Sequence, residues 1–210
     1  MIKIKEAAVD SVQSAREMIS RGANRIELNS RLDLGGITPD TKKIIDTLAI
    51  ANELPVVIMV RPRGGDFEYS SNEVEQMLDT MQIIADVGGE IVTFGAVSAD
   101  ELDFDSMSIL IGCAHKLHLQ VVMHMAFDQI ANHKQQNAMN WLSDHGVKRI
   151  LTHGGPLSVP IMQSLPHLQT LVNSAPANLT ILPGGGVTKM NAEAIANILG
   201  VNEVHGTQIV

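Results

Sequence analysis

The sequence has one cysteine, few aromatic residues and no long apolar run. The single cysteine, Cys113, excludes an intramolecular disulfide and a metal cage built from cysteine alone. Aromatic residues make up 3% of the 210 residues, so the side chains on which single-stranded nucleic acid stacks are scarce. Lys and Arg total 15 against 23 Asp and Glu, and the net charge of -8 opposes a nucleic-acid or anionic-membrane partner. We therefore expect a small molecule or a metal ion as the partner.

No apolar segment reaches membrane-spanning length, and the first residues, Met1 to Glu6, are too charged for a secretion signal. With the lone cysteine, this pattern predicts a cytoplasmic protein. The chain is 45% hydrophobic and 18% charged, and no low-complexity linker interrupts it. We expect a single domain that spans residues 1–210.

Short β-branched runs alternate with longer amphipathic stretches about eight times, which is typical of a βα repeat. The amphipathic stretches are the predicted helices, and their caps are expected at Asp10-Ser11, Thr38-Pro39, Ser71-Asn72 and Thr188, with Pro39 at a first helical position. The strands are predicted to begin near Ile2, Arg25, Val56, Ile91, Val121, Arg149, Leu179 and Glu203.

Alternate units resemble one another where a helix ends and a strand begins. The segments 22–27, 146–151 and 200–205 share a glycine followed three residues later by Arg25, Arg149 or Glu203, and 88–92 is a looser copy. The glycine fits the left-handed residue that closes a helix. Eight units that alternate in this way predict a (β/α)8 TIM barrel with eight parallel strands. An open doubly wound sheet is the alternative.

The sequence ends directly after the eighth strand, so the barrel is expected with its final helix missing. The outer flank of the last and first strands would then be apolar and open. Because a partner usually covers such a patch, we predict a homo-oligomer, most simply a homodimer.

In a TIM barrel, the groups that do chemistry lie at the carboxyl ends of the strands, and these ends are polar here. Arg61 and Arg63 follow the third strand, beside Gly64 and Gly65, and their planar guanidinium groups suit a carboxylate or phosphate. The loops after the sixth, seventh and eighth strands would complete an anion-binding pocket with His153, Gly184, Gly185, Gly186, Gly206 and Thr207. Such glycines also serve plain tight turns.

Acid–base chemistry at the same mouth would use Glu27, His124, Asp128 and His205, because histidine titrates near neutrality and a carboxylate can orient it or act as a base. A metal ion is the other possibility. Glu6, Glu27, His124 and His205 form a candidate oxygen and nitrogen site for zinc or manganese, although no tight ligand spacing announces it.

Several motifs together resemble the copper homeostasis protein CutC family over the whole chain: Arg25-Ile26-Glu27-Leu28, Gly35-Gly36-Ile37-Thr38-Pro39, Arg61 to Phe67, His124 to Asp128, Arg149 to Gly154, Gly184 to Val187 and His205-Gly206-Thr207. The resemblance implies a cytoplasmic barrel, often oligomeric, that binds copper and controls its intracellular level. Many similar proteins have cysteines where this chain has Ala8 and Asn29. Because cuprous ion prefers thiolates, a cysteine-based copper site does not carry over, and copper would need His, Met or Cys113.

Two functions are therefore open. One is copper binding in copper homeostasis, as the resemblance implies. The other is an enzyme of the lyase or isomerase type, acting on a small phosphorylated or carboxylated substrate that the arginines and glycine loops bind.

Overall fold

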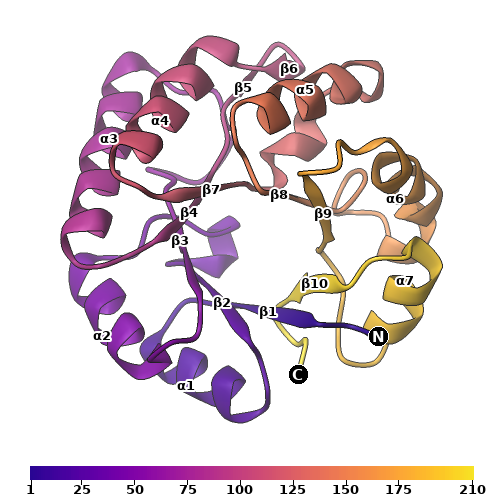
Figure 1. The fold of residues 1–210 in the computed structure, drawn as a ribbon, viewed down its shortest axis with the longest axis horizontal. Helices are drawn as coiled ribbons and strands as arrows, with labels where there is room; N and C mark the ends of the chain where they lie inside the picture. The colour runs from indigo at the N-terminus through magenta and orange to yellow at the C-terminus, as the bar shows by residue number, and fades with distance from the viewer.

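A computed structural model describes residues 1–210 as eight parallel strands in a nearly closed barrel with seven α-helices outside it (Figure 1). The predicted strand starts are confirmed to within two residues. The barrel strands are β1 (Ile4–Val9), β2 (Arg25–Leu28), β3 (Val56–Met59), β4 (Ile91–Phe94), β7 (Gln120–Met123), β8 (Arg149–Thr152), β9 (Thr180–Pro183) and β10 (Glu203–Gly206).

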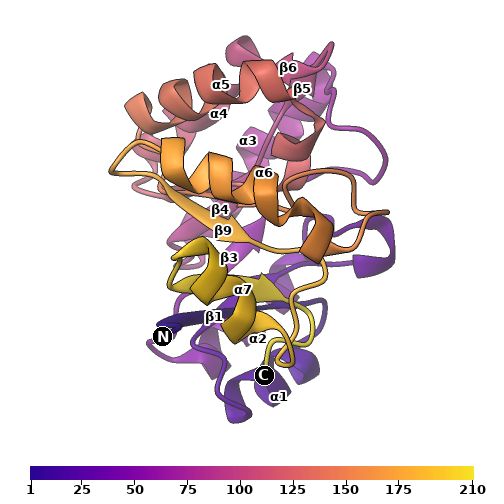
Figure 2. The same ribbon diagram turned by 90° about the vertical axis from the view of Figure 1, so that its right-hand side faces the viewer.

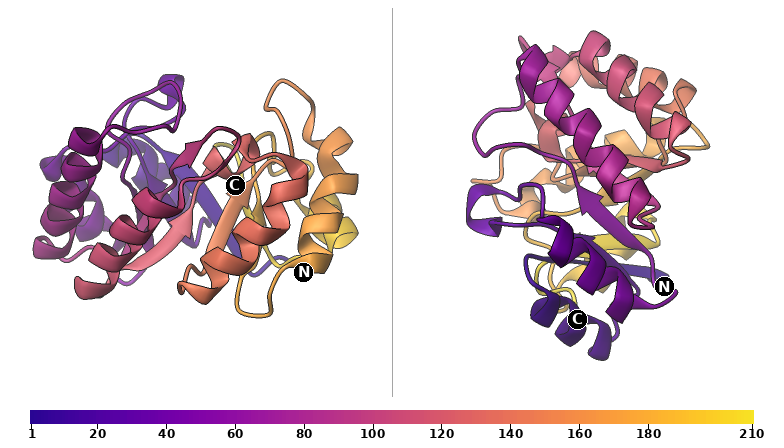
Figure 3. Two further views of the ribbon diagram at one scale, coloured as in Figure 1. Left: turned by 90° about the horizontal axis from the view of Figure 1, so that it is seen from above. Right: turned by 90° about the vertical axis from the view of Figure 1, so that its left-hand side faces the viewer.

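The helices follow the strands around the outside of the barrel, as two further views show (Figure 3). They are α1 (Val12–Ser20), α2 (Thr41–Ala51), α3 (Ser71–Asp86), α4 (Phe104–Lys116), α5 (Asn132–Asp144), α6 (Ile161–Ser174) and α7 (Ala192–Leu199). Between β4 and α4 lies a short antiparallel pair that periodicity did not predict, β5 (Val97–Ser98) with β6 (Glu101–Leu102). Two short 3-10 helices, η1 (Leu32–Leu34) and η2 (Met125–Gln129), lie in the loops after β2 and β7. None of the helices combines the length and apolar character needed to cross a bilayer.

The predicted helix caps are right at α1 and displaced at three other helices. Ser11 caps α1 as expected. The cap of α2 is Asp40, so Pro39 precedes the helix instead of occupying its first position. The capping box of α3 begins at Ser70, one residue early, and α7 starts only after Asn191, three residues beyond the predicted threonine. In each case a nearby polar side chain satisfies the first-turn amides or shapes the turn, which composition alone does not distinguish.

The two faces of the sheet differ in what they bury. The main core of 49 buried residues lies between the strands and the helices. The inner face contributes a separate apolar cluster of only three residues, Val57, Ile91 and Val122. Side chains alternate along a strand, so neighbouring residues such as Val121 and Val122 belong to different clusters. Much of the remaining interior is polar.

The barrel closes where the first and last strands meet. Glu6 of β1 lies opposite His205 of β10 in a parallel pair, whereas β9 and β10 are neighbours without a hydrogen-bonded ladder. Figure 2 shows this side of the barrel, with α6 and α7 packed across it and both termini nearby.

The expected open flank at this closure is wrong. The outward side chains of β1 and β10, Ala7, Val9 and Val204, are at most 1% exposed and belong to the main core, and Ile209 beyond β10 is also buried. No helix follows β10, but α1, α7 and the last residues cover these strands instead. The homodimer therefore stays a prediction, but an open apolar flank no longer supports it.

Candidate active site

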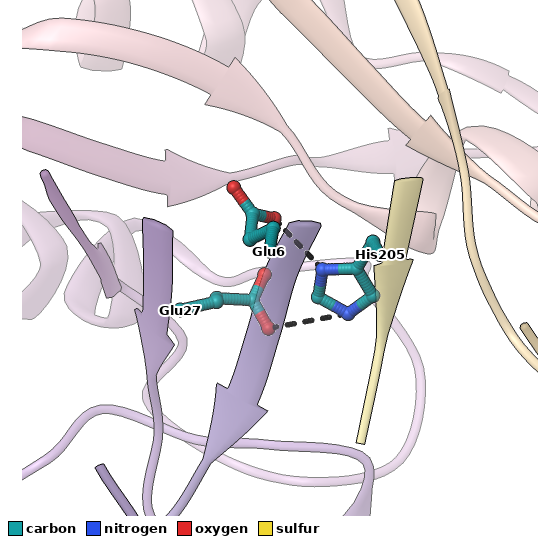
Figure 4. Close-up of side chains that lie close together, drawn as sticks. All are labelled: Glu6, Glu27 and His205. Carbon is teal, nitrogen blue, oxygen red and sulfur yellow. Dashed lines mark hydrogen bonds and ion pairs between the residues drawn. The ribbon is translucent and has the colours of Figure 1, made fainter. Parts of the chain in front are cut away.

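Three ionisable side chains converge inside the barrel near the carboxyl ends of its first, second and last strands. Glu6, Glu27 and His205 come from β1, β2 and β10, and all three are buried (Figure 4). The Nδ1 atom of His205 lies 2.7 Å from a carboxylate oxygen of Glu6, and its Nε2 atom lies 3.8 Å from Glu27. The parallel register brings them together, because Glu6 faces His205 on one side and Glu27 lies on the neighbouring strand.

A buried arginine holds Glu6 in place. The Nε atom of Arg25 donates to the second carboxylate oxygen of Glu6, and its terminal nitrogen donates to Glu203 over 2.7 Å. Glu6 therefore accepts from Arg25 on one oxygen and from His205 on the other. Because Glu6 accepts the Nδ1 proton, a neutral His205 has its lone pair on Nε2, the atom that faces Glu27. Asn29 also donates to Glu27 over 3.0 Å.

The same contacts shift the pKa values of the three groups. Burial alone would raise the pKa of Glu6, but the hydrogen bond from His205 and the charge of Arg25 outweigh it and lower the pKa to about 2. Burial raises the pKa of Glu27, and the charge of His205 only partly opposes this. Burial would lower the pKa of His205, but the charge of Glu27 and the hydrogen bond to Glu6 raise it overall. Both pKa values are thus raised, so a proton is held more strongly at Glu27 and at His205 than on the free side chains, which suits groups that exchange protons with a substrate.

A cavity of about 220 Å³ opens next to Glu27 and His205 at the mouth of the barrel. Both polar groups and apolar side chains line it. It is lined by Ala8, Glu27, Asn29, Leu32, Gly35, Met59, Phe67, His124, Met125, Leu151, Leu157, Gly185, Gly186, His205, Gly206 and Thr207. We call it the mouth cavity.

Two buried polar groups that line the mouth cavity have atoms without a partner in the chain. The Nδ1 atom of His124 accepts from the Ala126 amide over 3.2 Å, whereas its Nε2 atom is buried and unbonded. Burial and the nearby charge of Arg61 lower the pKa of His124 to about 3, so its neutral ring carries the proton on Nε2. The Oδ1 atom of Asn29 is likewise unpartnered. An unmet donor and an unmet acceptor mark a place for a polar ligand.

The two predicted anion-binding arginines lie outside the mouth cavity, on the loop after β3. Arg61 is buried and donates to the carbonyl oxygens of Leu34, Gly35, Gly36 and Gly65, and its guanidinium stacks over Phe67 at 4.4 Å. Arg63 is partly exposed and pairs with Glu73 and Asp66 over 2.5 and 2.9 Å. Both guanidinium groups organise the loop through protein partners.

Asp128 and His153 are brought together with each other and not with Glu27. Asp128 accepts from the hydroxyl of Thr152 and from the amides of His153 and Gly154. The ring nitrogens of His153 lie 2.8 and 2.9 Å from the carbonyl oxygens of Gly185 and Val159. These two residues connect the loops after β7, β8 and β9, and neither lines the mouth cavity.

The predicted glycine loop does reach the mouth cavity. Gly185 and Gly186 have φ of 73° and 93°, which only glycine adopts freely, and their amides donate to no group in the chain. Gly206 also lies on the wall, and a Cβ atom there would approach the carbonyl oxygen of Val187 to 2.2 Å. Gly184, by contrast, uses its amide in a hydrogen bond to Thr152.

The structure brings three of the four candidate metal ligands together and leaves the fourth apart. Glu6, Glu27 and His205 have ligand atoms within 4.8 Å of one another, whereas His124 lies apart from this group. Two carboxylates and one imidazole do not suit cuprous ion, and both oxygens of Glu6 already bind Arg25 and His205. Cys113, on α4, is half-buried and does not line the mouth cavity.

Sequence reasoning missed Arg25 and Glu203 as parts of the site. Their position was readable, since Arg25 lies two residues before Glu27 and Glu203 two before His205, on the same strand faces. Met59 and Phe67 line the mouth cavity as well. Met59 lies two residues after the inward Val57 on β3, so strand alternation indicates its direction, whereas no local pattern indicated that Phe67 turns inward.

Comparison with known proteins places this chain in a family. The sequence profile of the CutC family matches residues 3–210. The chain belongs to the CutC family. A protein of Enterococcus faecalis named as a CutC protein is 40% identical over 210 residues, which is 99% of this chain and 100% of that protein. The human copper homeostasis protein cutC homolog is 35% identical over 204 residues, which is 96% of this chain and 72% of the human protein.

A solved structure agrees with the fold. The CutC protein of Streptococcus agalactiae superposes with a TM-score of 0.94 at 30% sequence identity, and the match covers 100% of both chains. The CutC resemblance and the TIM-barrel prediction are therefore both confirmed.

Proposed function

We propose that this CutC family member is an enzyme that moves protons on a small carboxylated or phosphorylated substrate bound in the mouth cavity. The observation that carries the proposal is the arrangement of Glu6, His205 and Glu27. Glu6 fixes the orientation of His205, and His205 directs Nε2 toward Glu27 and the mouth cavity. A carboxylate that orients a histidine in this way is a recurring device of acid–base catalysis.

Each group has a distinct role in this proposal. His205, whose pKa is raised, holds a proton and a positive charge near neutral pH and attracts the anionic group of the substrate. Glu27, whose pKa is raised mainly by burial, removes a proton from the substrate or returns one. The free amides of Gly185 and Gly186 bind the anionic group, and the Nε2 proton of His124 binds a further oxygen. Lyase and isomerase reactions both need such proton transfers.

Arg61 and Arg63 support the site indirectly. Their guanidinium groups bind loop carbonyls and carboxylates, so substrate contact from them would require the loop to rearrange. We therefore assign anion binding to the glycine amides and His205 rather than to the arginines.

The experiment is a thermal-shift screen of small carboxylates and phosphate esters, followed by proton exchange in D2O. A ligand that stabilises the wild type is incubated with the protein, and NMR follows deuterium entering a carbon-bound position. We expect Glu27→Gln to slow the exchange by about 100-fold or more, as for loss of a general base. Glu193→Gln, an exposed glutamate on α7, is the matched control and should exchange like the wild type. Equal exchange in the wild type and Glu27→Gln would refute the proposal.

A second candidate function is copper binding, because relatives are named as copper homeostasis proteins. Softer donors do line the mouth cavity, namely Met59, Met125 and His124. A cuprous-ion competition titration against a chromogenic chelator tests this. Binding tighter than about micromolar, roughly 8 kcal/mol, that is lost in Met59→Leu with Met125→Leu would support copper. Weaker binding of cuprous ion would rule out copper binding as the function.

A further inference from the structure

Arg149 is a half-buried arginine whose guanidinium has no hydrogen-bond or ion-pair partner in the chain. It is the first residue of β8, and its Nε atom is buried with no hydrogen bond. The charged groups that act on it electrostatically are Arg25, Glu6 and Glu203, and none of them forms a hydrogen bond or an ion pair with it. Burial and the like charge of Arg25 lower the pKa of Arg149. Because arginine keeps its proton at any working pH, it does not escape this environment by becoming neutral.

Arg25 occupies the equivalent position on β2, but unlike Arg149 it has ion-pair partners. The repeat at helix ends places Arg25, Arg149 and Glu203 at the same step of three strands. Glu203 pairs with Arg25, and Glu6 pairs with Arg25 as well. Glu6 and Glu203 are therefore both used by Arg25, and neither pairs with Arg149.

A hollow of about 600 Å³ lies beside Arg149, at the amino-terminal end of the barrel and opposite the mouth cavity. Its wall combines the two arginines with amide and carboxylate side chains. We call it the basal hollow, and the polar residues that line it are Arg25, Asn52, Glu53, Glu90, Gln120 and Arg149. The guanidinium of Arg149 lines this space, and paired N–H groups of a guanidinium match the oxygens of a carboxylate or a phosphate.

We propose that the basal hollow binds a small molecule through a carboxylate or phosphate group, and that Arg149 is the residue that binds this group. Glu53 and Glu90 are exposed at the rim, so the other end of the ligand carries hydroxyl or ammonium groups that donate to them. Chemistry in this fold takes place at the opposite end, so the ligand stabilises or regulates the protein rather than reacting. Arg25 would relay its presence to the active site, because Arg25 binds Glu6, which orients His205.

The test compares the wild type with Arg149→Met, using inorganic phosphate and malonate as separate probes in an otherwise oxyanion-free buffer. At ten times its Kd, a probe should raise the wild-type melting temperature by roughly 3–6 °C. Arg149→Met should lose that rise, and without a probe it should melt at or above the wild-type temperature, because a half-buried unpaired charge has been removed. The probe that acts tells whether the site takes carboxylate or phosphate.

Two further variants keep the test decisive. His205→Gln should retain the Arg149-dependent rise, which separates this site from anion binding at the mouth cavity. Arg149→Lys keeps the charge without the planar fork and should weaken binding about tenfold; it replaces Arg149→Met if that variant does not fold. Identical probe-induced shifts in the wild type and the Arg149 variant would overturn the proposal.

Discussion

On the outer face of the barrel sheet, 49 buried residues form one continuous apolar core, whereas the inner face has an apolar cluster of three. The inner face instead holds a chain of charges that runs from Arg149 and Arg25 through Glu6 to His205 and Glu27. The outer face therefore provides most of the hydrophobic stabilisation, and the inner face positions charged groups at both ends of the barrel.

The largest expected effect is the loss of the arginine that connects the inner charges. Arg25→Met leaves the buried Glu6 and the half-buried Glu203 without their arginine partner, which should lower the free energy of unfolding by about 3–5 kcal/mol. Arg31→Met is the matched control, since Arg31 pairs with Asp33 on the surface and should change stability by about 1 kcal/mol or less. Urea unfolding measures both. Equal effects would mean that burial does not distinguish the two pairs.

The paired Arg25 and the unpaired Arg149 also show which parts of the structure can be predicted from the sequence. The repeat, the strand starts and the polar strand ends are local patterns, and they predicted the barrel and the meeting of Glu27 with His205. One of the two partners of Arg25 is Glu203, 178 residues away, and no local pattern assigns Glu203 to Arg25 rather than to Arg149. Contacts of that kind are set by register, which only the closed barrel defines.

The directions of side chains in the loops could not be predicted from the sequence either. Arg61 follows a strand as expected, but its guanidinium turns to carbonyls of residues 34–36, which belong to the preceding βα loop. The apolar flank expected at the closure is covered for a similar reason, because the burial of Val204 depends on how helices from both ends of the chain pack.

The next prediction concerns the pH dependence of the inner charges. The pKa of Glu6 is about 2 in the fold against an ordinary 4.5, so its ionised form stabilises the protein above pH 4.5, and this stabilisation is lost as the pH falls toward 2. The pKa of His205 is raised above its ordinary 6.5, so its contribution is complete below pH 6.5 and is lost as the pH rises through the folded value.

Glu6→Gln should abolish the loss of stability between pH 4.5 and pH 2, and it should reduce the loss of stability above pH 6.5. Urea unfolding of the wild type and Glu6→Gln from pH 2 to 9 measures both limbs. The difference in stability between the two proteins should be largest between pH 4.5 and 6.5 and should shrink toward pH 2. Parallel profiles would contradict the ionised Glu6 and its hydrogen bond to His205.

Two adjacent valines on β7 compare the two faces directly. Val121→Ala creates a cavity in the main core and should lower the free energy of unfolding by roughly 2–3 kcal/mol. Val122→Ala removes the same two methyl groups from the inner cluster, where few neighbours are lost, and should lower it by about 1–1.5 kcal/mol. Chemical denaturation of both variants provides the measurement. A larger loss of stability for Val122→Ala than for Val121→Ala would mean that the three-residue inner cluster stabilises the fold more than its size suggests.

The smallest effect is expected at Arg63, on the loop outside both faces. Its side chain is 38% exposed, and its partners Asp66 and Glu73 are 71% and 20% exposed, so water and salt screen these ion pairs. Arg63→Met should change the free energy of unfolding by about 1 kcal/mol or less, and 0.5 M NaCl should reduce that change further. A loss above about 2 kcal/mol that persists in salt would mean that Arg63 holds the mouth of the barrel together, in which case the loop would belong with the inner charge network.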